Sequence, residues 1–161
     1  MAREWWVVWA GRVRHDGWDE LCTDYRKRVE RHIVAREVVV RSRATLGPDR
    51  LAAEGAAILA SLPGTCRVVA LDRDGRPTSS EELAQRLESW RTEWSHPVVF
   101  VVGSDLGLSD QVLTRADWRM SFGRLTLPHE LARLVLWEQL YRAVAISTGS
   151  SYHRKSVGSL L

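Results

Sequence analysis

The sequence predicts an α/β protein built on a largely parallel β-sheet with helices on both faces. Apolar, β-branched segments alternate with segments of helical periodicity along the whole chain. Several of the apolar segments, such as Val98 to Val102, contain no polar residue, which is typical of parallel strands that helices cover on both sides. We see no repeat, low-complexity segment or internal linker, so we expect a single domain over residues 1–161.

Apolar spacing predicts the first two strands and the helix between them. The short run Trp5 to Trp9 ends at Gly11, as expected for a buried strand. Apolar residues at helical spacing, surrounded by basic side chains, predict an amphipathic helix over about residues 18–34. The β-branched segment Glu37 to Val40 predicts the second strand.

Breaking and capping residues organise the middle of the chain. Gly47-Pro48-Asp49 interrupts the chain and opens a helix. Residues 66–72 predict another buried strand, and Arg73 to Pro77 a turn. Ser79 or Ser80, placed before Glu81 and Glu82, predicts the cap of a helix that runs to Trp94.

The last third is expected to contain a strand over 98–102, a short helix over 109–116, a brief strand over 118–122 and a long helix. Pro128 fits the first position of that helix, where a missing N–H costs nothing. Trp137 and Leu140 are expected to lie off its core face, where a monomer would expose them, which predicts a homodimer. The expected core face carries Leu131, Leu134, Val135, Glu138, Tyr141, Arg142 and Ala145.

The composition is that of a globular protein, with 45% hydrophobic and 27% charged residues. A net charge of +3 is mild, so basicity alone is weak evidence for nucleic acid, and packing explains most of the eight tryptophans better than base stacking does. The two cysteines, Cys22 and Cys66, make neither a disulfide framework nor a metal site. Without a signal peptide or an apolar span long enough to cross a membrane, we expect a cytoplasmic protein.

Three loops that follow strands are candidates for a binding site, because ligands of open α/β sheets bind beyond the carboxyl ends of the strands. They are Leu71-Asp72, the segment Gly103 to Gly107, and the segment Phe122 to His129. Gly103 either lets a backbone approach a ligand closely or serves a plain turn with positive φ, and spacing favours the turn. The loop meets neither the P-loop nor the dinucleotide pattern.

The start of the long helix has no ordinary cap. Leu127 cannot cap, so either Thr126 does so from further back or the open N–H groups serve another acceptor, which is either a ligand such as a polar heterocycle or an anion, or water. Further along, Glu138 and Arg142 are four residues apart and are expected to form a structural ion pair.

The segment "LTLPHELARLVLWEQLYRAVAISTGSSYHR" resembles the C-terminal signature of the bacterial large-subunit ribosomal RNA pseudouridine N3-methyltransferases, small members of the SPOUT class. The resemblance extends more weakly over nearly the whole chain, for example at Gly11, Trp18 and Glu54-Gly55. The motif residues are Leu127, Pro128, His129, Arg133, Glu138, Gln139, Tyr141, Arg142, Ala143, Tyr152, His153 and Arg154.

The resemblance implies a SPOUT-type α/β domain with a C-terminal trefoil knot, and a homodimer whose active site is completed across the interface. It implies S-adenosylmethionine as cofactor, no metal, and methylation of N3 of a pseudouridine in large-subunit (23S) rRNA, on the assembled ribosome. The implied cofactor-binding positions are Leu71, Gly103, Phe122, Gly123, Arg124, Leu125, Thr126 and Leu127. His153 is expected to accept the N3 proton, Arg154 to steady the anion or hold phosphate, and Tyr152 to position or stack the base.

Two departures from the family pattern concern the site. Ser104 stands where the family usually has a second glycine, and residues 156–161 extend the chain beyond the closing motif. The altered loop leaves open a non-catalytic RNA- or ribosome-binding protein of the same fold. Packing of Tyr152 and His153 across a dimer is the alternative to their catalytic roles. A flavodoxin-like nucleotide or signalling domain also fits the strand-helix alternation but leaves the Tyr-His-Arg ending unexplained.

Overall fold

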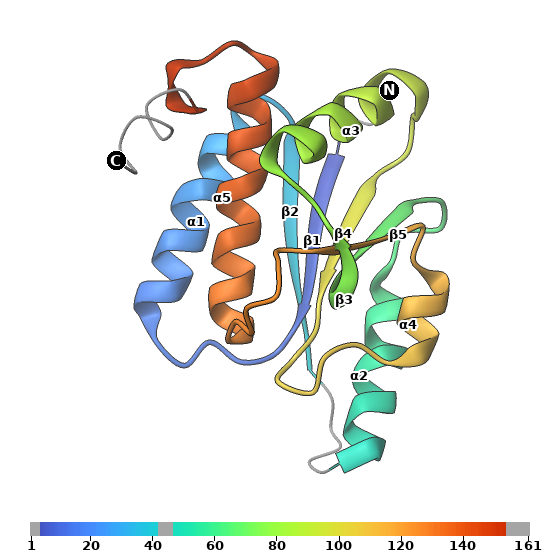
Figure 1. Ribbon diagram of the computed structural model, residues 1–161. Coiled ribbons are helices and arrows are strands. Elements are labelled where there is room, and N and C mark those ends of the chain that lie inside the picture. Colours follow the sequence, from blue (N-terminus) through green and yellow to red (C-terminus); the bar gives the residue numbers. More distant parts are fainter. Residues whose placement is uncertain (1–3, 42–46, 154–161) are drawn as a thin grey trace.

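A five-stranded, all-parallel β-sheet lies at the centre of the computed structural model (Figure 1), which describes residues 4–41 and 47–153. The strand order is β2-β1-β4-β3-β5, so Val7 of β1 lies opposite Glu37 of β2 on one side and Phe100 of β4 on the other. The strands are β1 (Glu4–Ala10), β2 (Val34–Val40), β3 (Arg67–Pro77), β4 (Val98–Val102) and β5 (Trp118–Ser121).

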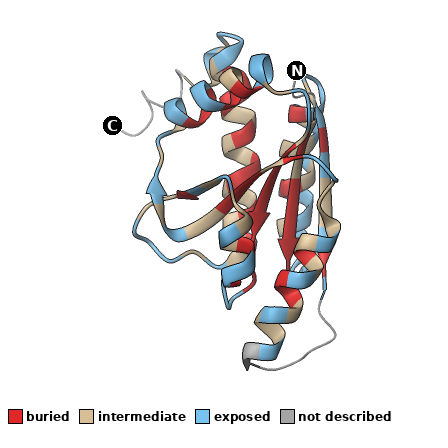
Figure 2. Cartoon of the chain, turned by 90° about the vertical axis from the view of Figure 1, so that its right-hand side faces the viewer, coloured by how far each residue is buried: buried red, intermediate tan, exposed pale blue. Residues whose placement is uncertain are grey.

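Helices cover both faces of the sheet, as the uniformly apolar strands predict. The side chains of Val7 and Trp9 pack with α1 (Asp16–Glu30), α3 (Ser80–Glu93) and α5 (His129–Ser147). Those of Val8 and Ala10 pack with α2 (Gly47–Ser61) and α4 (Asp110–Arg115) on the opposite face. Figure 2 shows the buried residues concentrated on the strands and on the helix faces turned toward them. The α/β prediction is therefore confirmed.

Most predicted elements occur with small shifts at their ends. The helix predicted to reach residue 34 ends at Glu30, because Val34 already pairs with Glu4 in the parallel ladder between β1 and β2. The expected turn at Arg73 to Pro77 instead belongs to β3, whose register is interrupted so that Leu71 and Arg76 both lie opposite Met120. Ser79 caps α3 in a capping box with Glu82, as predicted.

The long helix α5 differs from the prediction in two ways. Pro128 is the residue before the helix rather than its first helical residue. Trp137 and Leu140 are fully buried, and the expected core face is only partly buried, so the predicted exposed patch does not exist and that argument for a dimer is wrong. The reason is tertiary: α5 lies between α1 and α3 as well as on the sheet, and these neighbours determine which stripe is buried (Figure 1).

A glycine ends α5 and turns the chain back along it. Gly149 has a φ of 69°, and the N–H of Ser150 donates to the carbonyl of Ala145 at 2.8 Å, as in a Schellman motif. A short helical turn over residues 151–153 follows. Over the described part of the chain, none of the helices combines the length and apolar character that crossing a membrane requires.

Candidate active site

A cleft of about 780 Å³ opens at the carboxyl ends of β4 and β5 and at the register break of β3, and the three candidate loops from the sequence analysis line it. Leu71, Gly103 and the 122–127 loop reach it from three different strands, because parallel strands all end at the same edge. Of the eight cofactor positions implied by the resemblance, only Arg124 is not part of its lining. The other seven are Leu71, Gly103, Phe122, Gly123, Leu125, Thr126 and Leu127.

The loop after β4 folds back on itself tightly enough to require glycine at its first position. A Cβ atom on Gly103 would lie 2.3 Å from the carbonyl oxygen of Gly107. The positive φ of the turn, 79°, belongs to Gly107 and not to Gly103. Gly103 is therefore needed for close approach of the loop's own backbone, so the positive-φ turn expected for it is wrong, while its place in the cleft lining keeps the approach to a ligand a prediction.

Ser104 does not block the cleft with its hydroxyl group. Its Oγ donates a hydrogen bond to Oε2 of Glu54 at 2.6 Å and accepts one from the N–H of Leu106 at 3.3 Å. The side chain is buried, and its hydroxyl is directed toward α2. The departure from the family's second glycine is thus accommodated on the other side of the loop.

The loop between β5 and α5 forms one wall of the cleft. Gly123 has a φ of 121°, and its N–H and carbonyl both hydrogen-bond Oγ of Ser121, at 3.0 and 2.9 Å. Thr126 accepts a hydrogen bond from Nη1 of Arg73 at 3.2 Å and does not cap α5. Leu125 is 81% exposed at the edge of the cleft, where a ligand could cover it.

The first turn of α5 has backbone N–H donors at the cleft that no side chain of the described residues caps. The N–H groups of residues 129–131 have no side-chain cap, and the first intrahelical bond runs from Ala132 to the carbonyl of Pro128 at 2.9 Å. The structure thus excludes the Thr126 cap, and a ligand or water remains as the acceptor for these N–H groups. Such a terminus favours anions and acceptor atoms.

Buried aromatic and charged side chains hold this helix start in place. The His129 ring stacks on Trp9 with 6.0 Å between centroids, and the guanidinium of Arg133 lies 4.6 Å from the Trp9 ring. Arg133 is 1% exposed and donates to Oε2 of Glu37 at 3.0 Å and to Oδ1 of Asp19 at 2.9 Å. Glu37 is therefore the β2 residue that anchors α5. Burial lowers the pKa of Arg133, but the hydrogen bonds and charge of its partners, Glu37 first and then Asp19, raise it above its ordinary value.

Three carboxylates line the cleft, and two of them have arginine partners. Asp72 accepts from Nη2 of Arg119 at 2.6 Å. Hydrogen bonding to Arg50 lowers the pKa of Asp105. Glu130 is buried and accepts the backbone N–H of Arg14 at 2.7 Å.

Arg14 and Glu130 are site residues that sequence reasoning did not identify, and no local pattern marks them. Their proximity depends on the chain after β1 meeting the first turn of α5. Within the described ranges, no group of three or more His, Cys, Asp or Glu residues is arranged to hold a metal ion.

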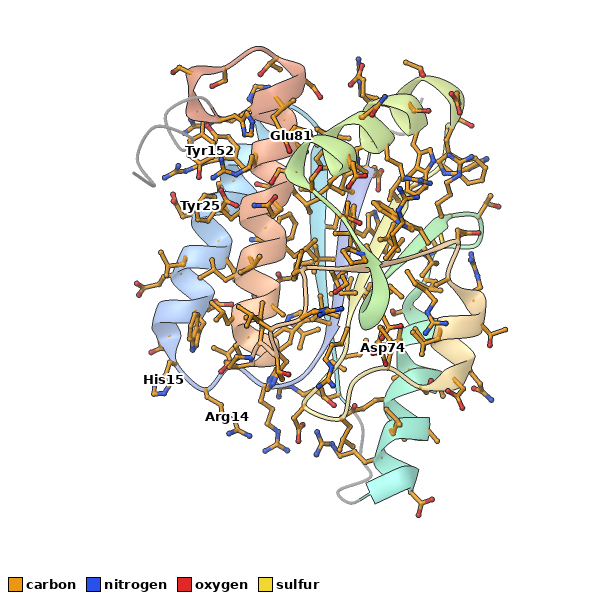
Figure 3. The ribbon with its side chains drawn as sticks, viewed as in Figure 1. Arg14, His15, Tyr25, Asp74, Glu81 and Tyr152 are labelled. Atoms are coloured by element: carbon orange, nitrogen blue, oxygen red, sulfur yellow. The ribbon has the colours of Figure 1, made fainter. Side chains whose placement is uncertain are left out.

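Figure 3 shows Tyr152 toward the other end of α5 from Arg14, which is part of the cleft wall. The Tyr152 hydroxyl donates to Oε1 of Glu138 at 2.9 Å and lies 3.5 Å from that of Tyr25. Burial, followed by these two hydrogen bonds, raises the pKa of Tyr152. Nε2 of His153 lies 2.9 Å from Oε1 of Glu81. A single chain thus does not bring these residues to the cleft, and Arg154 lies outside the described residues.

The predicted structural ion pair between Glu138 and Arg142 is confirmed, with Nε of Arg142 3.0 Å from Oε1 of Glu138. The same carboxylate oxygen accepts the Tyr152 hydroxyl. The Arg142 guanidinium also lies 4.9 Å from the Tyr152 ring. The pair therefore holds Tyr152 in place. We call the closing segment Tyr152-His153-Arg154 the tail.

The chain is similar to known methyltransferases over nearly its whole length. A family profile described as "Predicted SPOUT methyltransferase" matches residues 4–153. The ribosomal RNA large subunit methyltransferase H of Rubrobacter xylanophilus is 47% identical over 159 residues, covering 95% of this chain and 99% of that protein. Its counterpart from Solidesulfovibrio magneticus is 41% identical over 148 residues, covering 91% and 96%.

Solved structures support the fold. A probable methylase family protein from Haemophilus influenzae superposes with a TM-score of 0.56 at 13% identity, covering 94% of this chain and 70% of that one. A probable methyltransferase from Bordetella pertussis gives 0.53 at 16% identity, covering 88% and 96%.

Proposed function

The chain belongs to the SPOUT methyltransferase family, among the ribosomal RNA large subunit methyltransferase H proteins, and on this premise we propose that it methylates large-subunit (23S) rRNA with S-adenosylmethionine. The cleft carries the proposal, because it joins the three strand-end loops with the open start of α5. We place the reaction at N3 of a pseudouridine on the assembled ribosome, and therefore in the cytoplasm, following the family resemblance of the closing motif.

The residues of the cleft fit S-adenosylmethionine. A volume of about 780 Å³ lies within the range of about 300–1,000 Å³ usual for small-molecule sites. Apolar side chains can enclose the adenine, while open N–H groups at the start of α5 can donate to its ring nitrogens or to a carboxylate. The apolar residues are Leu71, Val102, Met120, Phe122 and Leu127.

The bound cofactor supplies a sulfonium methyl group, which is strongly electrophilic. The protein then has to hold the target base in line, favour its deprotonated form and exclude water. We assign proton acceptance to His153, stabilisation of the anionic base or phosphate to Arg154, and base positioning to Tyr152. Glu81, beside His153, is 63% exposed, so the imidazole can exchange this partner for substrate at little cost.

These roles require a second copy of the chain. The chain turns back along α5 only as far as Glu138, whose carboxylate the Tyr152 hydroxyl contacts, and nine residues of helix at ~1.5 Å per residue, about 14 Å, still lie between Glu138 and the start of α5 at the cleft. We therefore propose a homodimer in which the tail of one chain completes the cleft of its partner. We further propose that residues 1–161 form one domain, with 156–161 as a short extension, and that the C-terminal segment forms the trefoil knot of its class.

Transfer of labelled methyl groups to ribosomes tests the activity. Ribosomes from a strain lacking the enzyme should accept methyl groups at N3 of a pseudouridine, as mapped by mass analysis of rRNA nucleosides. Binding of S-adenosylmethionine without any transfer would favour the non-catalytic RNA-binding alternative.

Mixing two inactive variants tests the shared site. Gly103→Val fills the cleft loop of one variant, and His153→Ala removes the tail group of the other. Co-refolding equal amounts should yield about half mixed dimers, each with one intact site of two, hence about a quarter of wild-type activity. A mixture as inactive as its parents would contradict a site shared between chains.

A further inference from the structure

A buried carboxylate on α2 lies directly behind the loop after β4. Glu54 is 7% exposed, and none of the α2 residues takes part in lining the cleft. Its Oε2 accepts the hydroxyl of Ser104 at 2.6 Å, and its Oε1 accepts Nε of Arg50 at 2.9 Å. The carboxylate therefore reaches the site only through the loop.

Arg50 extends this contact to the tip of the loop. Its Nη2 pairs with Oδ1 of Asp105, so one guanidinium joins Glu54 to Asp105. Within the loop, the N–H of Gly107 donates to the carbonyl of Ser104 at 2.9 Å. We call Arg50, Glu54, Ser104 and Asp105 the α2 clamp.

A glycine makes the close approach of α2 possible. A Cβ atom on Gly55 would lie 2.1 Å from Oγ of Ser109, the residue that caps α4. Any side chain at position 55 would push α2 away from the start of α4. Because only Leu108 separates Ser109 from the loop, this contact also sets how near Glu54 comes to Ser104.

We propose that Glu54 is a positioning residue that holds the 103–107 loop in the form that receives S-adenosylmethionine, and thereby sets the affinity for this cofactor. The loop contributes Gly103, Ser104, Asp105 and Gly107 to the cleft, so its shape is part of the binding surface. A loop held in its binding form has less conformational freedom to lose when the cofactor binds. The inference rests on the proposed function for the identity of the ligand.

The clamp also explains Ser104. Glycine at this position could not donate to Glu54, whose carboxylate would then be buried with Arg50 as its remaining partner. The Ser104 hydroxyl therefore helps to hold the loop in place through its contact with α2, on the side of the loop that faces away from the cleft. Ser104→Gly is accordingly expected to weaken cofactor binding rather than tighten it.

Two single variants and their combination test the clamp. Glu54→Gln keeps the size of the side chain but removes its charge, and Ser104→Ala removes the hydroxyl. The control is Glu93→Gln, because Glu93 accepts the hydroxyl of Ser89 at 2.9 Å in a similar but exposed pair on α3. Hydrogen exchange at the amides of Leu106 and Gly107, measured without cofactor, should be about tenfold faster in Glu54→Gln and unchanged in the control.

Kinetics should separate positioning from general damage. In Glu54→Gln, the Kd and KM for S-adenosylmethionine should rise about tenfold, while kcat at saturating cofactor and KM for ribosomes stay within about twofold of wild type. The Kd of the double variant for S-adenosylmethionine should be no higher than that of the weaker-binding single variant, since both substitutions remove the same contact.

Exchange rates and affinities equal to those of the control would overturn the proposal. A fall in kcat and melting temperature with KM for the cofactor unchanged would overturn it as well, by assigning Glu54 a purely structural role. A wild-type protein that binds no S-adenosylmethionine would instead refute the proposed function. The exchange rates would then decide alone whether Glu54 holds the loop.

Discussion

Replacing Glu37 with glutamine should destabilise the protein strongly, because it leaves a buried guanidinium without its main counter-ion. Arg133 is 1% exposed, and the side chain of Glu37 is 8% exposed. Removing one member of a buried ion pair costs about 3–5 kcal/mol. Oδ1 of Asp19 remains 2.9 Å from Nη2 of Arg133, and glutamine can still accept the N–H of Trp137. We therefore expect a loss at the lower end of this range, about 3 kcal/mol of the free energy of unfolding.

Thermal unfolding followed by circular dichroism measures this loss. For a chain of this size, about 3 kcal/mol corresponds to a fall in melting temperature of about 6–12 °C. The control is Asp24→Asn, whose partner Arg28 is exposed, and which should cost at most about 1 kcal/mol. Adding Arg133→Met to Glu37→Gln should restore much of the stability, since an apolar pair needs no counter-ion. A Glu37→Gln protein that melts within 2 °C of wild type would refute the buried pair as the anchor of α5.

Four further outcomes are expected, two from the structure and two from the closing motif of the sequence. Gly103→Ala should weaken binding of S-adenosylmethionine at least about tenfold in calorimetry, because its Cβ would collide with the carbonyl of Gly107, and unchanged affinity would show that the loop can move aside. Burial raises the pKa of Cys22 from 9.0 to about 11. The neutral thiol therefore makes its full contribution to the free energy of unfolding below pH 9, and this contribution is lost as the pH rises through 11. In urea unfolding, the free energy of unfolding of the wild type should therefore fall by about 2–3 kcal/mol relative to that of Cys22→Ala between these pH values. Parallel pH profiles of the two proteins would contradict this. Arg154→Ala should lower methyl transfer to ribosomes at least about tenfold with melting temperature unchanged, whereas full activity would remove it from the site. Removing residues 156–161 should leave transfer intact, since the family motif ends at residue 154, and a loss would give the extension a role.

The elements and their burial could be predicted largely from local pattern. The uniformly apolar run over 98–102 is β4, fully buried at the centre of the sheet. The Ser79–Glu82 spacing is the capping box of α3. Such features depend on residues only a few positions apart, and for this reason they can be predicted from the sequence alone.

The buried face of α5 could not be predicted in this way. Its apolar residues nearly surround the helix, so periodicity does not single out one stripe, and contacts with α1 and α3 decide that Trp137 and Leu140 are inside. Arg133 and Glu37, 96 positions apart in the chain, meet for the same reason.

For the site, the sequence alone determined which loops gather, because the ends of parallel strands share one edge, and the closing motif indicated the chemistry. Only the tertiary structure decided how those loops are held: Glu54 behind Ser104, Glu130 against the backbone of Arg14, and the tail at the far end of α5. The physical reason is how far apart in the chain the interacting residues lie. Strand order and capping depend on short-range spacing and the rules of chain connection, whereas a hydrogen bond between distant residues depends on distances of a few ångströms that only packing fixes.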